Sequence, residues 1–292
     1  MVSGAPCQNA AMHKFIGAVI LAALLSGCAI HIKDTSFMRP VAAGEIVVVG
    51  GELPLAYSLV SDKISTPDGK QLYRAKFSHP KAKSTVLFFG GNRSTLEKSA
   101  IATATELTRD WHPNIVLADY RGYGQSTGTP SLEALRSDAL QLYDLEAKIA
   151  KESGLKMIVA GFSLGGVVAG GLLEERQPDG AILMATVTNV PEMLEMALSW
   201  YMKPFVRVSI DPPLLGVDNL RAIRGFKGPL LVVGAEKDSQ TPVIFSRRLF
   251  DASLSPAPLK RLVVVPGVDH NELLFAPEVR AALRQFEMDH GF

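Results

Sequence analysis

The stretch VAGFSLGGVVAG, residues 159–170, decides the fold of this chain. It places Ser163 in a Gly-x-Ser-x-Gly pattern between Gly161 and Gly165, within a long apolar run. A serine flanked in this way can be a nucleophile on a strained strand-to-helix turn, or the glycines can simply join a strand to a helix. Because so short a pattern also occurs by chance, the rest of the sequence must choose between the two interpretations.

Apolar runs and helix-period segments alternate on both sides of this stretch. Most of the runs are continuous, which is typical of parallel strands covered on both faces. We expect strands at residues 45–51, 72–79, 84–91, 114–120, 155–161, 180–186, 229–235 and 260–267. Helices are expected at residues 96–109, 132–152, 166–176, 243–252 and 277–288. This order predicts a doubly wound, mostly parallel, eight-stranded sheet in one α/β domain, residues 45–292, with its site beyond the carboxyl ends of the strands.

Residues 187–224 interrupt the alternation. They contain the apolar segment PEMLEMALSWYMKPF, residues 191–205, between two predicted strands. A helix that merely packs on the body is one interpretation. The position at the edge where a substrate would enter favours a small helical cap over the site.

A nucleophilic serine needs a base, and the positions of the histidines relative to the strands favour one. Among the six histidines, His270 follows the last predicted strand at the correct edge of the sheet. We expect it to accept the proton of Ser163, and we expect Asp238, after the preceding strand, to orient the imidazole. Glu236 is an alternative acid, whereas Asp269 adjoins His270 and is poorly placed to face its ring.

Backbone N–H groups must stabilise the negative oxygen that forms when a serine attacks a carbonyl. One is expected from Leu164, the residue after the nucleophile. The second is expected from the loop GGNRST, residues 90–95, where two glycines let the backbone approach a substrate closely.

The N-terminal region carries a secretory pattern. Lys14 precedes an apolar run, residues 15–25, that is too short to span a bilayer and leads into LSGC, which ends at Cys28. This arrangement resembles a bacterial lipoprotein signal, in which residues 1–27 are removed and the cysteine is acylated, for instance with palmitate. Residues 28–44 would then be a tether to the membrane.

The same resemblance implies a location in the cell envelope. Ala29 follows the cysteine, and a residue other than Asp there implies the outer membrane, facing the periplasm, in a Gram-negative cell. A soluble secreted protein with an ordinary signal is the alternative. Met12 competes with Met1 as the start of the chain.

Composition narrows the classes of partner. The net charge is +1, so there is no electrostatic support for binding nucleic acid. Cys7 and Cys28 are the two cysteines, and a processed, acylated chain would have neither a disulfide nor a free thiol. No HExxH or CxxC pattern occurs. We therefore expect no metal or other cofactor, and a small-molecule or lipid acyl substrate.

Five segments between residues 84 and 275 resemble the α/β-hydrolase superfamily, and within it the serine aminopeptidase-like and ABHD-type serine hydrolases. They are FFGGN, ADYRGYGQSTGTPS, GFSLGG, DNLRAIRGFKGPLLVVGAEKDSQTP and PGVDHNEL. The resemblance implies the α/β-hydrolase fold, a triad in the chain order Ser163, Asp238, His270, and structural roles for Asp119 and Arg121.

The resemblance also assigns the second oxyanion donor to Asn92, with Gly91 or Arg93 as alternatives if the loop is shifted by one residue. The chain departs from the family in this loop, because relatives carry a histidine where this chain has Gly90. That histidine normally supports the oxyanion loop, so its replacement puts the support of the loop in doubt.

The activity implied is hydrolysis of an ester-type bond (carboxylester, lipid ester or thioester) through an acyl-enzyme. An aminopeptidase or amidase is the alternative, and it would need acidic residues near the pocket to capture a free amine. Glu192 and Glu195 are the candidates for that role. A catalytically inactive hydrolase fold that serves as a binding lipoprotein is a further alternative.

Overall fold

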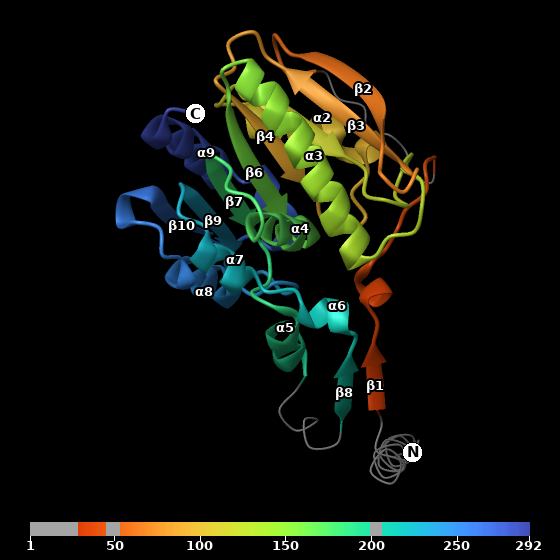
Figure 1. Ribbon diagram of the computed structural model, residues 1–292. Helices are drawn as coiled ribbons and strands as arrows, with labels where there is room; N and C mark the ends of the chain where they lie inside the picture. Colours follow the sequence, from red (N-terminus) through yellow and green to blue (C-terminus); the bar gives the residue numbers. More distant parts are fainter. Residues whose placement is uncertain (1–28, 45–52, 199–205) are drawn as a thin grey trace, which may run out of the picture.

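An eight-stranded sheet forms the centre of the molecule (Figure 1). The computed structural model describes residues 29–44, 53–198 and 206–292. The strands are β2 (Ser58–Ser65), β3 (Gln71–Ser78), β4 (Ser84–Phe89), β5 (Asn114–Ala118), β6 (Lys156–Phe162), β7 (Gly180–Met184), β9 (Leu230–Ala235) and β10 (Lys260–Val265). Their order is β10-β9-β7-β6-β4-β5-β3-β2, and all neighbours are parallel except β3 with β5 and β2 with β3. The predicted doubly wound, mostly parallel sheet is confirmed.

One edge strand of the sheet differs from the sequence prediction. The sequence pattern does not indicate β2, because its side chains form no buried face and almost all of them are exposed. β2 joins the sheet by pairing antiparallel with β3, from Ser58 opposite Ser78 to Ser65 opposite Gln71. The strand expected at residues 45–51 lies outside the described residues.

Helices cover both faces of the sheet. They are α2 (Leu96–Thr108), α3 (Leu132–Glu152), α4 (Leu164–Leu173), α5 (Val190–Ala197), α6 (Pro212–Leu215), α7 (Asn219–Gly225), α8 (Ile244–Ala252) and α9 (Pro277–His290), with 3-10 turns η1 (Asp34–Phe37), η2 (Ala257–Leu259) and η3 (His270–Phe275). One apolar core includes residues of α3, α4, α7 and α8, and the other includes residues of α2 and α9. None of the helices in the described ranges is long and apolar enough to cross a membrane.

A second, two-stranded sheet joins the N-terminal region to the predicted cap segment. β1 (Ala29–Ile32) pairs in parallel with β8 (Arg207–Ile210), and the pair projects from the body near α5 and α6 (Figure 1). His31 fastens the two strands, since its Nε2 lies 2.9 Å from Asp211 Oδ1 and its Nδ1 lies 2.8 Å from Ser209 Oγ. The rest of the predicted cap consists of α5, α6 and α7, and α7 packs on α4 and α8 of the body. Residues 199–205 of this segment lie outside the described residues.

Residues 29–44, which we call the strap, continue from β1 onto the body. Met38 and Val41 are buried, and the Val41 carbonyl accepts a 2.7 Å hydrogen bond from the Gly124 N–H. The Gly44 N–H donates to Glu97 Oε2 at 2.9 Å. The segment interpreted from sequence as a tether is therefore packed against the domain. Cys28 and the predicted signal peptide lie outside the described residues.

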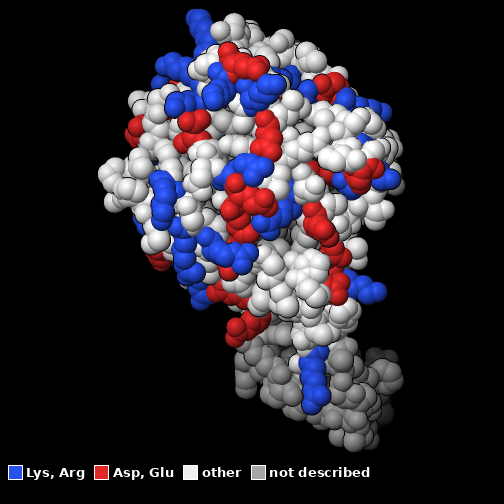
Figure 2. All heavy atoms as spheres, in the orientation of Figure 1, with Lys and Arg blue, Asp and Glu red and all other residues white. Residues whose placement is uncertain are grey.

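Acidic and basic side chains are interspersed over the face of the body in Figure 2. Many of them pair across neighbouring elements. Arg136 of α3 contacts Glu174 and Glu175 at the end of α4, and Arg176 contacts Asp144 of α3. Exposed pairs of this kind contribute little each, so their main effect is a surface of mixed charge.

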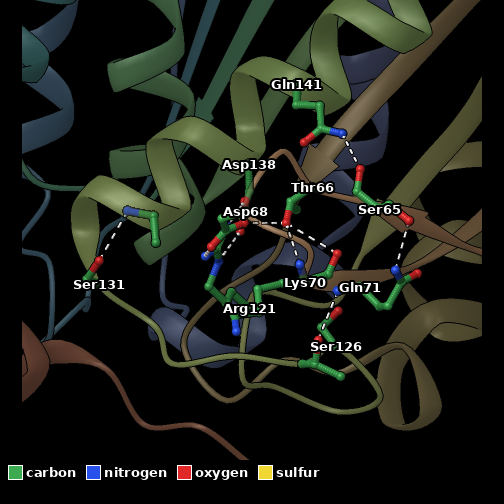
Figure 3. A network of polar contacts seen from close by, with 12 residues as sticks. Ser65, Thr66, Asp68, Lys70, Gln71, Arg121, Ser126, Ser131, Asp138 and Gln141 are labelled. Atoms are coloured by element: carbon green, nitrogen blue, oxygen red, sulfur yellow. Dashed lines mark hydrogen bonds and ion pairs between the residues drawn. The ribbon is translucent and has the colours of Figure 1, made fainter.

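A buried ion pair holds the turn after β5 against α3 (Figure 3). Arg121 donates to Asp138 Oδ2 at 3.0 Å and to Oδ1 at 2.6 Å, and it also contacts Asp68 in the β2–β3 turn at 2.5 Å. Hydrogen bonding to Asp138 raises the pKa of Arg121, and the Arg121 hydrogen bond lowers the pKa of Asp68 to about 2. Arg121 and Asp138 are buried, whereas the Asp68 side chain is half exposed.

We expect Arg121→Met to destabilise the protein by about 3–5 kcal/mol, because it leaves the Asp138 carboxylate buried without its partner. Asp68→Ala should cost far less, since water replaces its contact. Urea unfolding followed by circular dichroism measures both changes. Equal losses for the two variants would contradict a structural role concentrated in the buried pair.

Candidate active site

Ser163 lies on a strained turn between β6 and α4. Its backbone has φ 56° and ψ −117°, a conformation that a residue with a side chain rarely adopts. The flanking glycines explain how the turn fits. A Cβ on Gly161 would lie 2.2 Å from the Gly165 carbonyl oxygen, and a Cβ on Gly165 would lie 1.9 Å from the Phe89 carbonyl oxygen. Both positions therefore require glycine, and the serine between them is raised at the carboxyl edge of the sheet.

Asp238 and His270 meet at the same edge. Asp238 follows β9, His270 begins η3 after β10, and Asp238 Oδ2 lies 2.7 Å from His270 Nδ1. The imidazole ring packs against Phe162, the residue before Ser163, with 5.0 Å between ring centroids. The histidine is 2% exposed and the aspartate 6% exposed. The arrangement leaves Nε2 as the nitrogen free to act on a proton.

The alternative acids have other partners. Glu236 Oε2 accepts a 2.8 Å hydrogen bond from the Gly267 N–H. Asp269 caps η3, and its Oδ1 accepts from the His270 N–H at 2.7 Å. Asp238 is thus the carboxylate that holds the His270 ring.

Thr241 also contacts Asp238, a role that was not predicted from the sequence. Its N–H donates to Asp238 Oδ1 at 2.7 Å, and its Oγ1 lies 2.8 Å from Asp238 Oδ2 and 3.1 Å from His270 Nδ1. Burial alone would raise the pKa of Asp238, but hydrogen bonds from His270 and Thr241 outweigh it and lower that pKa. The aspartate therefore stays ionised beside the imidazole at neutral pH.

The loop after β4 lies against the serine turn. A Cβ on Gly91 would be 3.1 Å from the Phe162 ring and 3.6 Å from Ser163 Cβ. Within the described residues, the backbone N–H groups of Leu164 and Asn92 donate to no protein atom. Those of Gly91 and Arg93 are equally unpartnered there, so hydrogen bonding alone does not choose the second donor.

Two tyrosines support this loop, in which the family resemblance led us to expect a histidine at the position of Gly90. The Tyr120 hydroxyl donates to the Gly90 carbonyl at 2.6 Å, and the Tyr123 hydroxyl donates to Asn92 Oδ1 at 2.9 Å. A side chain at position 90 would displace Ser94, because its Cβ would lie 2.7 Å from Ser94 Oγ. Neither tyrosine was expected to have this role, although both stand in the segment DYRGYG, residues 119–124.

The Asn92 side chain also fastens the strap. Its Nδ2 donates to the Phe37 carbonyl at 2.6 Å, and its Oδ1 accepts from the Arg39 N–H at 3.1 Å. The same Arg39 N–H lies 2.9 Å from the Tyr123 hydroxyl. The strap and the loop after β4 are therefore held as one unit beside Ser163.

A cavity of about 540 Å³ opens over these residues. Ser163, Leu164 and Asn92 form part of its wall. Its apolar wall comes from α3, α4 and the cap segment, and includes Leu132, Val167, Val187, Val190, Met193 and Leu214. Arg39 and Arg93 line it as well, and within the described residues its wall contains no Asp or Glu.

Comparisons with known proteins show the family of this chain. A family model described as "Serine aminopeptidase, S33" matches residues 80–211. An uncharacterized protein of Mycobacterium tuberculosis is 30% identical over 249 residues, which cover 84% of each chain. The chain belongs to the α/β-hydrolase superfamily.

Other α/β-hydrolases are more distant. Lysophosphatidylserine lipase ABHD12 of Macaca fascicularis is 27% identical over 220 residues, and the match spans 69% of this chain and 55% of that lipase. The esterase Pf2001 of Pyrococcus furiosus superposes with a TM-score of 0.63 at 18% identity, over 85% of this chain and 98% of the esterase. Est1E of Butyrivibrio proteoclasticus, with ferulic acid bound, superposes with a TM-score of 0.62 at 18% identity, over 78% of this chain and 98% of Est1E. At such identities the two structures show the shared fold.

We expect Asn92→Ala to loosen the strap of this α/β-hydrolase, because the Phe37 carbonyl loses its partner and the Arg39 N–H keeps only the Tyr123 hydroxyl. Loss of such hydrogen bonds costs about 1–3 kcal/mol, which should speed local opening about 5- to 150-fold. Hydrogen–deuterium exchange of peptides covering residues 33–42 measures the effect. Asn271→Ala, at another asparagine of the cavity wall, is the control and should leave this exchange unchanged. Unchanged exchange in Asn92→Ala would show that the strap is held by other contacts.

Proposed function

We propose that this protein is a serine hydrolase of ester-type bonds, with Ser163 as nucleophile, His270 as base and Asp238 as the residue that orients the base. The observation that carries the proposal is the 2.7 Å contact between Asp238 Oδ2 and His270 Nδ1 beside the strained Ser163 turn. This contact supplies the oriented base that serine activation requires, and the ring of that base packs against Phe162, the residue before the serine.

The proposed reaction uses these three residues and the two oxyanion donors that the family resemblance assigns. His270 Nε2 takes the Ser163 hydroxyl proton as Oγ attacks the substrate carbonyl, and the oxyanion accepts from the Leu164 and Asn92 N–H groups. The tetrahedral intermediate expels the alcohol, which receives the proton from His270, and leaves an acyl group on Ser163. Water then attacks the acyl-enzyme with His270 as base, and His270 returns the proton to Ser163 Oγ as the acid leaves.

The cavity supports an ester in preference to a peptide with a free amino terminus. Capture of an amine would need carboxylates, and the described cavity wall has none. Glu192 is already engaged, since it contacts Arg248 and accepts a hydrogen bond from Thr188. The apolar wall suits an acyl chain, and the names of the relatives, an ABHD12 lipase and two esterase-type structures, agree with ester chemistry.

We expect a fluorophosphonate probe to label the purified full-length protein, and Ser163→Ala to abolish the label. His270→Gln should slow labelling by about two orders of magnitude or more, because the hydroxyl loses its base. Ser239→Ala, at an exposed serine beside Asp238, is the matched control and should label normally. Absence of labelling in the wild type would favour the inactive binding protein, and equal labelling of Ser163→Ala would exclude Ser163 as the nucleophile.

We also propose that the chain is anchored in the cell envelope by a lipid on Cys28, in the outer membrane facing the periplasm if the cell is Gram-negative. The support is the LSGC pattern and the place where the strap begins. Ala29, the next residue, starts β1, and β1 pairs with β8 of the cap segment. A lipid at this point would hold the cap end of the domain, which contributes Val190, Met193 and Leu214 to the cavity wall, near the membrane.

In a bacterial host, metabolic labelling with an alkyne fatty acid should mark the wild type and fail on Cys28→Ser. Cys7→Ser is the control, because Cys7 lies in the segment that processing would remove, and it should label normally. Labelling that persists in Cys28→Ser would remove the lipoprotein assignment and leave the proposed hydrolase activity untouched.

A further inference from the structure

The cavity over Ser163 carries positive charge at one corner. Arg93 belongs to the loop after β4, directly after Asn92, and Arg39 belongs to the strap whose backbone is bonded to the Asn92 side chain. Asn92 therefore links the backbones of the two arginines, although the arginines are 54 positions apart in the sequence. Both line the cavity, and both are exposed.

Within the described residues, neither Arg39 nor Arg93 has an ion pair, whereas other arginines of the body, such as Arg121 and Arg136, are paired with carboxylates. The described cavity wall also has no acidic residue that could turn toward them. A substrate with an anionic group at this corner would meet two cations with no competing carboxylate.

The backbone is constrained at both arginines. Arg93 has φ 70°, a left-handed conformation that costs free energy for a residue with a side chain. The Arg39 N–H is held by Asn92 Oδ1 and the Tyr123 hydroxyl, at 3.1 Å and 2.9 Å. Two guanidinium groups fixed at their base in this way can form charge-assisted hydrogen bonds to phosphate or carboxylate oxygens.

We propose that Arg39 and Arg93 are specificity-determining residues, which select esters that carry an anionic group in addition to an apolar acyl chain. This inference rests on the proposed ester hydrolysis at Ser163. The apolar wall formed by α3, α4 and the cap takes the chain, and the arginine corner takes a phosphate on the alcohol side or a carboxylate on the acyl side. The shared chemistry is a pair of anionic oxygens next to an ester.

Two pairs of esters test the inference on the full-length protein in neutral detergent. The first pair is monodecanoylglycerol and its phosphate ester, which differ by a phosphate on the alcohol side. The second pair is p-nitrophenyl hydrogen suberate and its methyl ester, which differ by a free carboxylate on the acyl side. For each pair, the ratio of kcat/KM for the anionic ester to that for the neutral ester is measured in Arg39→Gln, Arg93→Gln and the double variant.

We expect the wild type to prefer the anionic member of at least one pair by about tenfold or more, as one to two charge-assisted hydrogen bonds would give. The double variant should lose this preference, mainly through KM, and Arg39→Lys with Arg93→Lys should restore part of it. The pair in which the preference is lost identifies the source of the anion. Arg224→Gln, at an exposed arginine of α7 outside the cavity wall, is the control and should keep the wild-type ratio.

The failure of this inference and the failure of the proposed function look different. If the wild type labels with fluorophosphonate and hydrolyses the neutral esters without an anionic preference, the arginines have no selective role and the inference is wrong. It is also wrong if the double variant keeps the wild-type ratio. If the wild type neither labels nor hydrolyses any of the four esters, the proposed hydrolase activity fails, and the inference that rests on it fails too.

Discussion

The site depends on how closely the turn after β6 approaches the end of β4. Side chains at Gly161 and Gly165 would collide with backbone carbonyl groups at 2.2 Å and 1.9 Å. Because only bare backbone fits, the chain can turn sharply enough to hold Ser163 at φ 56° and still start α4 at the next residue. The loop after β4 and the loops after β9 and β10 then reach the same edge, since parallel strands end there together.

The sequence predicted the parts of the fold and site that depend on local patterns of residues. The buried strands are continuous apolar runs, and the glycines around Ser163 mark the turn. The pairing of Asp238 with His270 could be expected because both follow strands of one parallel sheet, and β9 and β10 are neighbours. The order of the strands therefore made it possible to predict a contact between residues 32 positions apart.

The features that the sequence did not predict depend on contacts without a local pattern. β2 is almost wholly exposed, so it has no apolar face to reveal it, and it exists because β3 offers a free edge. The sequence does not distinguish Tyr123 from other aromatic residues of the core, yet its hydroxyl contacts both Asn92 and the Arg39 N–H of the strap. Nothing in residues 29–44 indicates packing against the body, because their partners, such as Asn92 and Asp211, stand far along the chain.

The pairing of β1 with β8 has a consequence for the order of folding. His31 and Ser209 stand 178 residues apart, so this contact closes nearly two thirds of the chain into a loop. On a ribosome, the first strand must wait until six of the eight strands of the central sheet have been synthesised before its partner exists. A short pair with exposed residues and few buried contacts is also the kind of unit that opens first in the native state. The β1–β8 pair is thus expected to loosen before the buried part of the strap, which holds Met38 and Val41 against the body.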